Sequence, residues 1–294
     1  ATLPEHSEAL VACDCEPAVC TPEMVAALAR AAEKLGKRVS VHIKVDTGMG
    51  RIGIYPDQVQ AFIEHCHHYP AIHVRGIMSH FPRADEADKT FSYQQIEMFK
   101  RVAEMVRPHG IEVRHMANSA AILDLPDSYF DAARPGIAIY GLHPSQAIQN
   151  PQVNELRPVL EWKSRITFLK EVAAATGLSY GHTYTTQRSS LIATIPVGYG
   201  DGLSRNLSNN IDFLVAGRRC PQVGRITMDM CLIDVTALRG HVELGDEVVI
   251  IGVQQQEEIT ADELADKLGT INYEIVTAIS HRVPRIVMQY ENTP

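Results

Sequence analysis

The part of the chain that decides the fold reads Val41-His42-Ile43-Lys44-Val45-Asp46-Thr47-Gly48-Met49-Gly50-Arg51-Ile52-Gly53. It is typical of a β-strand that ends in a glycine-rich loop. Charged side chains, Lys44 and Arg51 among them, stand where the strand stops. Because α/β barrels place their chemistry at the carboxyl ends of their strands, the stretch predicts a barrel-type fold and a candidate site together.

Composition and charge indicate a globular protein rather than one that binds nucleic acid or a membrane. The 294 residues, 45% of them hydrophobic, suffice for about two domains at roughly 150 residues each. The net charge is −8 with both signs interspersed, so no basic surface is expected. No apolar run approaches the ~20 residues that span a bilayer, and the first residues do not resemble a signal peptide. We expect a cytoplasmic protein.

The six cysteines are expected to be reduced thiols rather than a disulfide framework. Cys13, Cys15 and Cys20 together with the histidines of residues 65–68 match no standard zinc spacing, so no metal site is predicted. We expect Cys13 and Cys15 in a buried strand, and the histidine cluster at the polar end of a helix.

The first half alternates predicted strands and helices. Thr21 caps a helix with Pro22 in its first position, and Gly36 ends it. Further helices begin near Pro56 and Phe91. Six candidate strands are predicted, at residues 10–13, 39–45, 72–79, 113–117, 130–133 and 137–140. Their alternation with helices implies parallel pairing and right-handed crossovers.

Six strands are too few for a closed barrel. A (β/α)8 barrel has eight strands and typically ~250 residues, whereas this half has only about 150. The count predicts an incomplete (β/α)8 TIM-type barrel that lacks about two strand–helix units. An open sheet of six strands is the alternative that the spacing leaves open.

The pattern changes after Pro151. Turn glycines separate β-rich runs at residues 161–172, 189–196, 211–216, 231–235 and 247–251, which predicts a mainly antiparallel β domain. One helix is expected, where Thr260 and Glu263 form a capping box. We therefore predict a partial barrel over residues 1–153 and a β domain over residues 154–294.

Four clusters of residues carry chemistry-bearing groups. Any one of them alone is more typical of packing, capping or a solvated loop. Taken together, the clusters of the first half all fall near the ends of predicted strands. The clusters are Lys44 with Arg51; Ser79-His80-Phe81; Asn118-Ser119 with Arg134-Pro135-Gly136-Ile137; and, in the second half, Ser179-Tyr180-Gly181-His182, Gly198-Tyr199-Gly200-Asp201-Gly202 and Met228-Asp229.

These groups suit cofactor chemistry. Ser119 and the backbone N–H groups of Gly136 and Ile137 suit a phosphate, because small residues let the backbone approach it. Arg51 and Arg134 supply fixed donors for a phenolate oxygen and a ring nitrogen. A tyrosine beside cationic groups has a lowered pKa and serves as a base.

In this order, the motifs resemble those of the fold-type III alanine racemases, which use pyridoxal 5′-phosphate (PLP). The resemblance covers about residues 21–286. It rests on residues 44–53, 196–202 and 224–229 and on the segments His115-Met116-Ala117-Asn118-Ser119, Arg134-Pro135-Gly136-Ile137-Ala138-Ile139-Tyr140-Gly141, Leu178-Ser179-Tyr180-Gly181 and Arg282-Val283-Pro284-Arg285. It implies an isomerase that interconverts L-alanine and D-alanine for peptidoglycan precursors, as a homodimer with shared active sites.

The resemblance also implies catalytic roles. Tyr180 would move the Cα proton on one face of the PLP-bound substrate, across the dimer interface, and His80 would orient it. Arg134 would face the pyridine nitrogen and keep it unprotonated. Arg51 would hold the cofactor phenolate and the region of the substrate carboxylate, and Lys44 matches a position that is carbamylated in some members.

The remaining implied roles concern binding. The cofactor would be held by Asn118, Ser119, Arg134, Gly136, Ile137 and His281, and the substrate by Arg51, Tyr199, Met228 and Asp229. His281 stands where the family often has a phosphate-contacting tyrosine.

The resemblance leaves one gap. The family's Schiff-base lysine lies on its first barrel strand, which we expect ahead of Ala1, so this chain alone is expected to be inactive. Two alternatives remain: a non-catalytic binding or dimerisation subunit, and a racemase of another amino acid such as serine or lysine.

Overall fold

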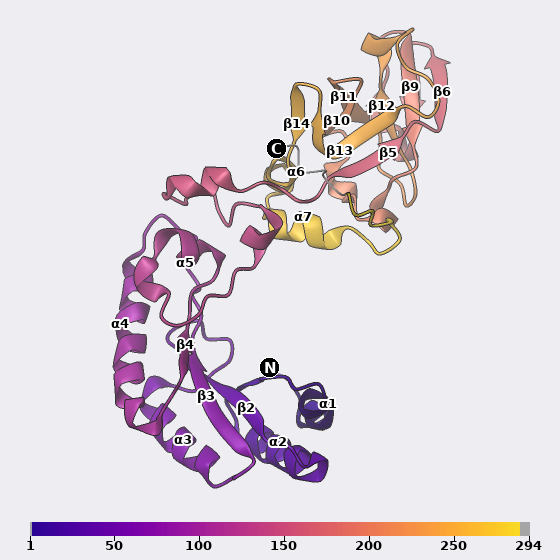
Figure 1. The fold of residues 1–294 in the computed structure, drawn as a ribbon. Coiled ribbons are helices and arrows are strands. Elements are labelled where there is room, and N and C mark those ends of the chain that lie inside the picture. The colour runs from indigo at the N-terminus through magenta and orange to yellow at the C-terminus, as the bar shows by residue number, and fades with distance from the viewer. Residues whose placement is uncertain (1, 289–294) are drawn as a thin grey trace. The chain divides into compact units, whose positions relative to one another are not determined.

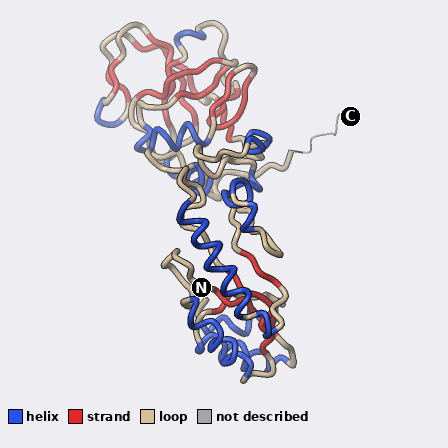
Figure 2. The backbone as a smooth tube through the Cα atoms, turned by 90° about the vertical axis from the view of Figure 1, so that its left-hand side faces the viewer, coloured by secondary structure: helices blue, strands red, loops and turns tan. Residues whose placement is uncertain are grey.

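The computed structural model describes residues 2–288, which form two compact units that divide between Arg157 and Pro158. Each unit has its own main sheet, with β2, β3 and β4 labelled in the first unit and β5, β6 and β9 to β14 in the second (Figure 1), and Figure 2 colours the strands of both red. The division expected from the sequence, between residues 153 and 154, falls within the short helix η6 (Pro151–Glu155). No helix of the described residues is long and apolar enough to cross a membrane.

The first unit is built on a four-stranded parallel sheet. Its strands are β1 (Ala18–Val19), β2 (Val39–Lys44), β3 (Ile72–Met78) and β4 (Val113–His115), which pair in sequence order. The helices that alternate with them are α2 (Pro22–Leu35), η2 (Pro56–Gln58) with α3 (Val59–His67), α4 (Thr90–Met105) and α5 (Ser119–Asp124), and they flank the strands in Figure 1. Parallel strands in sequential order with intervening helices are the arrangement of a TIM-type barrel, so the predicted fold class is confirmed.

Three of the six predicted strands of this unit are wrong, and with them the six-stranded open sheet. Residues 10–13 lie in α1 (Ser7–Ala12) and just after it, and Cys13 and Cys15 are exposed rather than buried in a strand. Residues 130–133 contribute only an isolated bridge between Ala132 and His115. Residues 137–140 form the 3-10 helix η5 (Ile137–Tyr140). Apolar runs of four residues fit a strand and a short helix equally well, so only long-range pairing decides between them.

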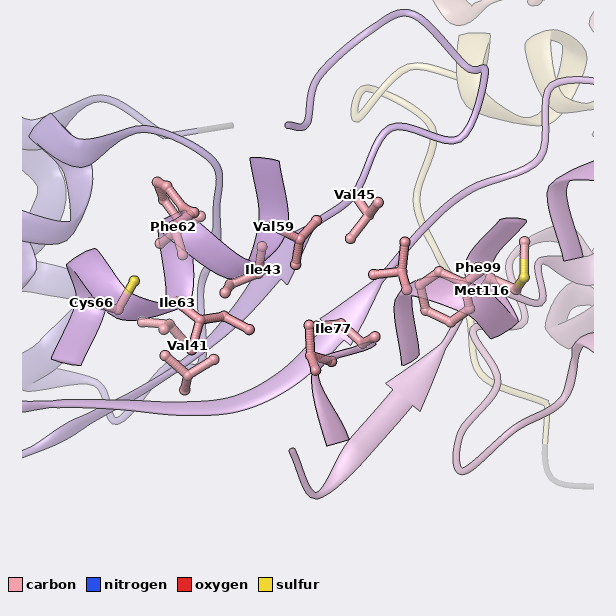
Figure 3. Close-up of a cluster of buried hydrophobic side chains, with 14 of the residues drawn as sticks. Val41, Ile43, Val45, Val59, Phe62, Ile63, Cys66, Ile77, Phe99 and Met116 are labelled. Atoms are coloured by element: carbon pink, nitrogen blue, oxygen red, sulfur yellow. The ribbon is translucent and has the colours of Figure 1, made fainter. Parts of the chain in front are cut away.

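The helices follow the sequence signals closely. The Thr21 hydroxyl accepts a hydrogen bond from the Met24 N–H at 3.3 Å, and Gly36 ends α2 in the left-handed region at φ 63°. Figure 3 shows the core that results, in which Val41 and Ile43 of β2 are buried in one cluster with Val59 and Ile63 of α3. Burying each such side chain stabilises the fold by about 1.5–3 kcal/mol.

The second unit is the predicted mainly antiparallel β domain. Its main sheet runs in the order β14-β13-β10-β11-β12-β9-β6, and β5 pairs with β13. The strands are β5 (Trp162–Arg165), β6 (Phe168–Val172), β9 (Ser190–Ile195), β10 (Asp212–Val215), β11 (Arg218–Val223), β12 (Cys231–Asp234), β13 (Glu247–Gln254) and β14 (Glu257–Ile259). A separate hairpin of β7 (Gly177–Leu178) and β8 (Tyr184–Thr185) carries the turn η7 (Tyr180–His182).

Two details of this unit differ from expectation. Helix α6 (Ala261–Leu268) begins as predicted, with the Thr260 hydroxyl accepting from the Glu263 N–H at 3.0 Å, but the Glu263 carboxylate binds Arg219 instead of closing a capping box. A second helix, α7 (Asn272–Ala278), was not expected because its β-branched residues favour strands.

Candidate active site

The candidate residues of the first unit meet at the carboxyl ends of β2, β3 and β4. Lys44 is the last residue of β2, and Ser79 and His80 follow β3. The Ser79 hydroxyl donates to the Val45 carbonyl at 2.9 Å and ties the two strand ends together. Arg134 reaches the same point, since its Nη2 donates to the Ser79 carbonyl at 2.8 Å. The structure therefore brings together clusters that lie up to 90 positions apart, from 44 to 134, in the sequence.

Arg134 is the centre of this site. Nη1 donates to His115 Nδ1 at 2.7 Å, and Nη2 donates to the Ser79 and Met116 carbonyls and to His80 Nδ1, the last at 3.2 Å. Burial lowers the pKa of this guanidinium, yet an arginine stays cationic in proteins. All of these acceptors are neutral groups, so they orient the positive charge without cancelling it.

A directional chain of hydrogen bonds leads away from Arg134. Because a guanidinium only donates, His115 Nδ1 must accept, and the proton of this neutral ring is on Nε2. His115 Nε2 then donates to His42 Nδ1 at 3.0 Å, and His42 Nε2 faces the Glu16 carboxylate at 3.0 Å. Burial, with Arg134 adding to it, lowers the pKa of His115 to about 4, which keeps the ring neutral.

The chain of histidines needs a glycine opposite it. Gly76 of β3 pairs with His42 of β2, and a Cβ added at Gly76 would lie 2.3 Å from His42 Nδ1 and 2.7 Å from the Val113 carbonyl oxygen. No real Cβ comes so close to another atom. Gly76 therefore leaves the space in which the two imidazole rings meet.

Lys44 carries a buried amine with little to bind. The residue is 2% exposed, and Nζ makes one long hydrogen bond, 3.5 Å to the Val45 carbonyl. Burial lowers the pKa of Lys44 to about 8, with Arg134 and Arg51 adding to the shift and Asp46 opposing it. The Asp46 carboxylate is itself held by the backbone N–H groups of Gly48 and Gly50. Lys44 is thus an amine that is partly unprotonated near neutral pH.

His80 is a neutral ring in the same environment. Burial lowers its pKa to about 4, and the cations Arg134, Lys44 and Arg51 add to the shift. Because Nδ1 accepts from Arg134, the ring proton is on Nε2. His80 therefore presents a fixed N–H donor rather than a base.

Ser119 and the turn after Arg134 lie side by side, where the phosphate cradle is predicted. The Asn118 side chain accepts from the Ala121 N–H at 3.0 Å and caps α5. The Ser119 hydroxyl oxygen accepts from the Gly136 N–H at 2.7 Å and from the Ala138 N–H at 3.3 Å. Ile137 is the first residue of η5, so its N–H has no acceptor within that helix. The structure thus places the four predicted residues together, with the Gly136 N–H already bound to Ser119.

In the second unit Tyr180 projects from the tip of the β7–β8 hairpin and is 73% exposed. The turn is fixed to a neighbouring loop, because the Ser179 hydroxyl donates a hydrogen bond to the Arg225 carbonyl at 2.7 Å. Ser179 has φ 58°, an unusual value for a residue other than glycine. The hairpin therefore presents the phenol on a constrained backbone.

Tyr199, Met228 and Asp229 meet on a second surface of this unit. Tyr199 begins η8 (Tyr199–Asp201), and its N–H donates to the Thr227 carbonyl at 3.0 Å. All three side chains are exposed, whereas the neighbouring Gly198 backbone is buried. The Arg282 guanidinium donates to the Asp229 carboxylate at 2.7 Å, and His281 beside it is exposed.

Some predicted relations remain predictions. His80 and Arg51 belong to the first unit, whereas Tyr180 and Tyr199 belong to the second. The expected contact between His80 and Tyr180 is therefore not part of either unit's geometry. Sequence reasoning also missed His115 as a partner of Arg134, and His42 and Glu16 as the next members of that chain. A signal existed for His42 alone, since Ser40, His42 and Lys44 alternate with apolar residues along β2 and therefore share one face.

Comparisons with known proteins agree along almost the whole chain. Residues 1–144 match the family described as alanine racemase, N-terminal domain, and residues 159–287 match alanine racemase, C-terminal domain. The chain is 47% identical over 292 residues to the alanine racemase of Halothermothrix orenii, which covers 99% of this chain and 76% of that protein. It is 40% identical over 291 residues to the alanine racemase of Clostridium novyi, with 98% and 75% covered.

Solved structures give the same result. The alanine racemase of Clostridium difficile 630 superposes with a TM-score of 0.90 at 37% identity, over 96% of this chain and 73% of that one. The alanine racemase of Bacillus anthracis with bound L-Ala-P superposes with a TM-score of 0.89 at 36% identity, over 98% and 74%. The chain thus spans about three quarters of the length of these relatives, and by sequence, fold and the site at its strand ends it belongs to the alanine racemase family.

Proposed function

We propose that this chain carries the cofactor-binding and proton-transferring residues of a PLP-dependent isomerase that interconverts L-alanine and D-alanine. The observation that carries the proposal is the cationic cluster at the strand ends of the first unit. Arg134 has only neutral acceptors, and Lys44 has no ion pair within residues 2–288. Such a cluster favours an anionic ligand.

The residues of the first unit fit PLP, which has a phosphate and a phenolate oxygen. Ser119 and the N–H groups of Gly136 and Ile137 would hold the phosphate, next to Asn118. When bound, PLP supplies an electron sink that stabilises the negative charge left at Cα after proton loss. Arg134 would face the pyridine nitrogen and, as a permanent cation, keep it unprotonated.

Arg51 would bind the phenolate oxygen and the substrate carboxylate region. Its side chain is exposed and makes no hydrogen bond or ion pair within the described part of the chain, so its donors are open to a ligand. We further propose that Lys44 reacts with CO2. The neutral amine attacks the carbon of CO2, an N–C bond forms, and one proton leaves, so a carbamate anion replaces a buried cation. An anion at this position would hold the Arg51 guanidinium in place.

Tyr180 would take or deliver the Cα proton on one face of the substrate, and His80 would orient the phenol through its fixed N–H. Tyr199, Met228 and Asp229 would shape the substrate entrance, and His281 would replace a phosphate contact. These residues would act across a homodimer interface, in a cytoplasmic enzyme that supplies D-alanine for cell-wall precursors.

The test uses the full-length protein loaded with PLP and given L-alanine in D2O. We expect D-alanine to form with deuterium at Cα, until both enantiomers are present in equal amounts. Serine and lysine are expected to react more slowly. If PLP binds but no deuterium enters alanine, the proposed function is wrong. If serine or lysine exchanges faster than alanine, the substrate is another amino acid.

A further inference from the structure

The segment Arg282-Val283-Pro284-Arg285 follows α7, and no catalytic or binding role is assigned to its two arginines. The Arg282 guanidinium lies between two carboxylates of other loops. Its Nη2 donates to Asp229 Oδ1 at 2.7 Å, and its Nε lies 3.3 Å from Asp201 Oδ1. The Asp201 side chain is nearly buried and its other oxygen accepts from the Gly198 N–H at 3.0 Å. Arg282 therefore joins a carboxylate that is fixed inside the loop to one that is exposed.

The space for Arg282 is created by a glycine. A Cβ added at Gly200 would lie 2.5 Å from Arg282 Nη1 and 3.1 Å from the Met228 carbonyl oxygen. The Gly200 N–H donates to that same carbonyl at 2.9 Å, and the Ser280 N–H donates to the Asp201 carbonyl at 2.9 Å. Residues 198–202, 228–229 and 280–282 are thus hydrogen-bonded to one another, and the Arg282 side chain contacts the first two of these segments.

Arg285 offers a contrast within the same segment. Within residues 2–288 its guanidinium donates to backbone carbonyls alone, those of Ile279, Ser280 and Val283, at 2.7–3.1 Å. It therefore stabilises the end of α7 without touching a carboxylate. Variants of Arg282 and Arg285 can therefore be compared to separate two effects. One is the anchoring of the C-terminal segment, and the other is the pairing of Asp229 with a positive charge.

We propose that Arg282 is a positioning residue that determines substrate specificity, because it holds Asp229 and offsets its negative charge, and so keeps amino acids with cationic side chains from being favoured. The inference rests on the proposed function, in which Asp229 lies at the substrate entrance. An exposed carboxylate without a partner attracts a cation, whereas one paired with a guanidinium does not. The Asp229 side chain is 55% exposed, so solvent limits the effect to the scale of a surface ion pair.

The test compares Arg282→Met with Arg285→Met in the full-length holoenzyme. For each variant, kcat and KM are measured for L-alanine and for L-lysine, at low and at high salt. In Arg282→Met we expect the KM for alanine to rise with kcat nearly unchanged. We expect the ratio of kcat/KM for lysine to that for alanine to rise about fivefold at low salt, and less at high salt. Arg285→Met should lower the thermal midpoint but leave this ratio unchanged.

Further variants keep the inference separable from the proposed function. Adding Asp229→Asn to Arg282→Met should abolish the gain for lysine, and Arg282→Lys, which keeps the charge, should restore most of the original ratio. An unchanged ratio in Arg282→Met, or an equal change in Arg285→Met, overturns the inference. Failure of the unaltered enzyme to racemise alanine at all would instead overturn the proposed function.

Discussion

The two units present their candidate residues in opposite ways. In the first unit Lys44, His80 and Arg134 are partly or fully buried, and burial together with the charge of Arg134 lowers the pKa of both Lys44 and His80. In the second unit Tyr180 and Tyr199 are exposed on turns, and hydrogen bonds of the neighbouring residues Ser179 and Asp201 hold those turns. The difference indicates a division of labour. In the proposed function, burial tunes the charges that would hold an anionic cofactor, and a constrained exposed turn would present the proton-carrying side chain.

The contrast predicts that a change in the second unit alters the reaction without altering the fold. Tyr180→Phe removes one hydroxyl from a side chain that is 73% exposed, so the free energy of unfolding should change by less than about 0.5 kcal/mol. The racemisation rate should fall by about 10²–10⁴-fold, the usual cost of losing a general base. Steady-state kinetics in both directions and urea unfolding measure the two effects. Tyr93→Phe, an exposed tyrosine of α4, is the control. A rate within twofold of the unaltered enzyme would make Tyr180 a packing residue.

In the first unit, by contrast, one substitution should damage the fold as well. Arg134→Met leaves His115 Nδ1 and the Ser79 and Met116 carbonyls without their donor, at about 1–3 kcal/mol for a buried unsatisfied group. We expect the free energy of unfolding to fall by about 2–3 kcal/mol in urea titrations. Arg114→Met removes an exposed pair with Asp131 and should cost less than about 1 kcal/mol. Equal losses in both variants would contradict the central place of Arg134.

Buried histidines should also make stability depend on pH. The pKa of His115 and that of His80 are both lowered to about 4, below the ordinary 6.5. Between pH 4 and 6.5 the unfolded chain therefore binds more protons than the folded one. The free energy of unfolding should therefore increase as the pH rises across that window and decrease as the pH falls through it. In His115→Asn, which still accepts from Arg134, the slope should become smaller, since one of the rings with a lowered pKa is gone. An unchanged slope would mean that His115 does not titrate in this way.

Much of the first unit could be predicted because its signals are local. The cap at Thr21, the stop at Gly36 and the apolar stripes of α2, α3 and α4 are all readable within one turn or strand. Because Lys44, His80 and Asn118 lie at or just after the ends of predicted parallel strands, they were expected at the same edge of the sheet. The false strands at residues 10–13 and 137–140 failed for the opposite reason, since a run of four apolar residues acquires its structure from distant partners.

The contacts that tune the site were beyond the sequence. His42 and His115 are 73 positions apart, and their bond depends on the register that sets Gly76 opposite His42. The ion pair of Arg282 with Asp229 likewise depends on three loops that meet at Gly200. Sequence motifs mark such residues as belonging to a family, but not what each of them touches.

In the proposed function, Arg134 and the groups around it in the first unit would hold the cofactor, while the second unit would supply the proton carrier. The most direct measurement is the dissociation constant of PLP for the full-length protein, followed by absorbance, in Arg134→Met and in Tyr180→Phe. We predict at least about tenfold weaker binding in Arg134→Met, since one charge-assisted contact is worth about 1.5–3 kcal/mol. Tyr180→Phe should bind PLP within twofold of the unaltered protein. Undiminished binding in Arg134→Met together with weakened binding in Tyr180→Phe would contradict the account.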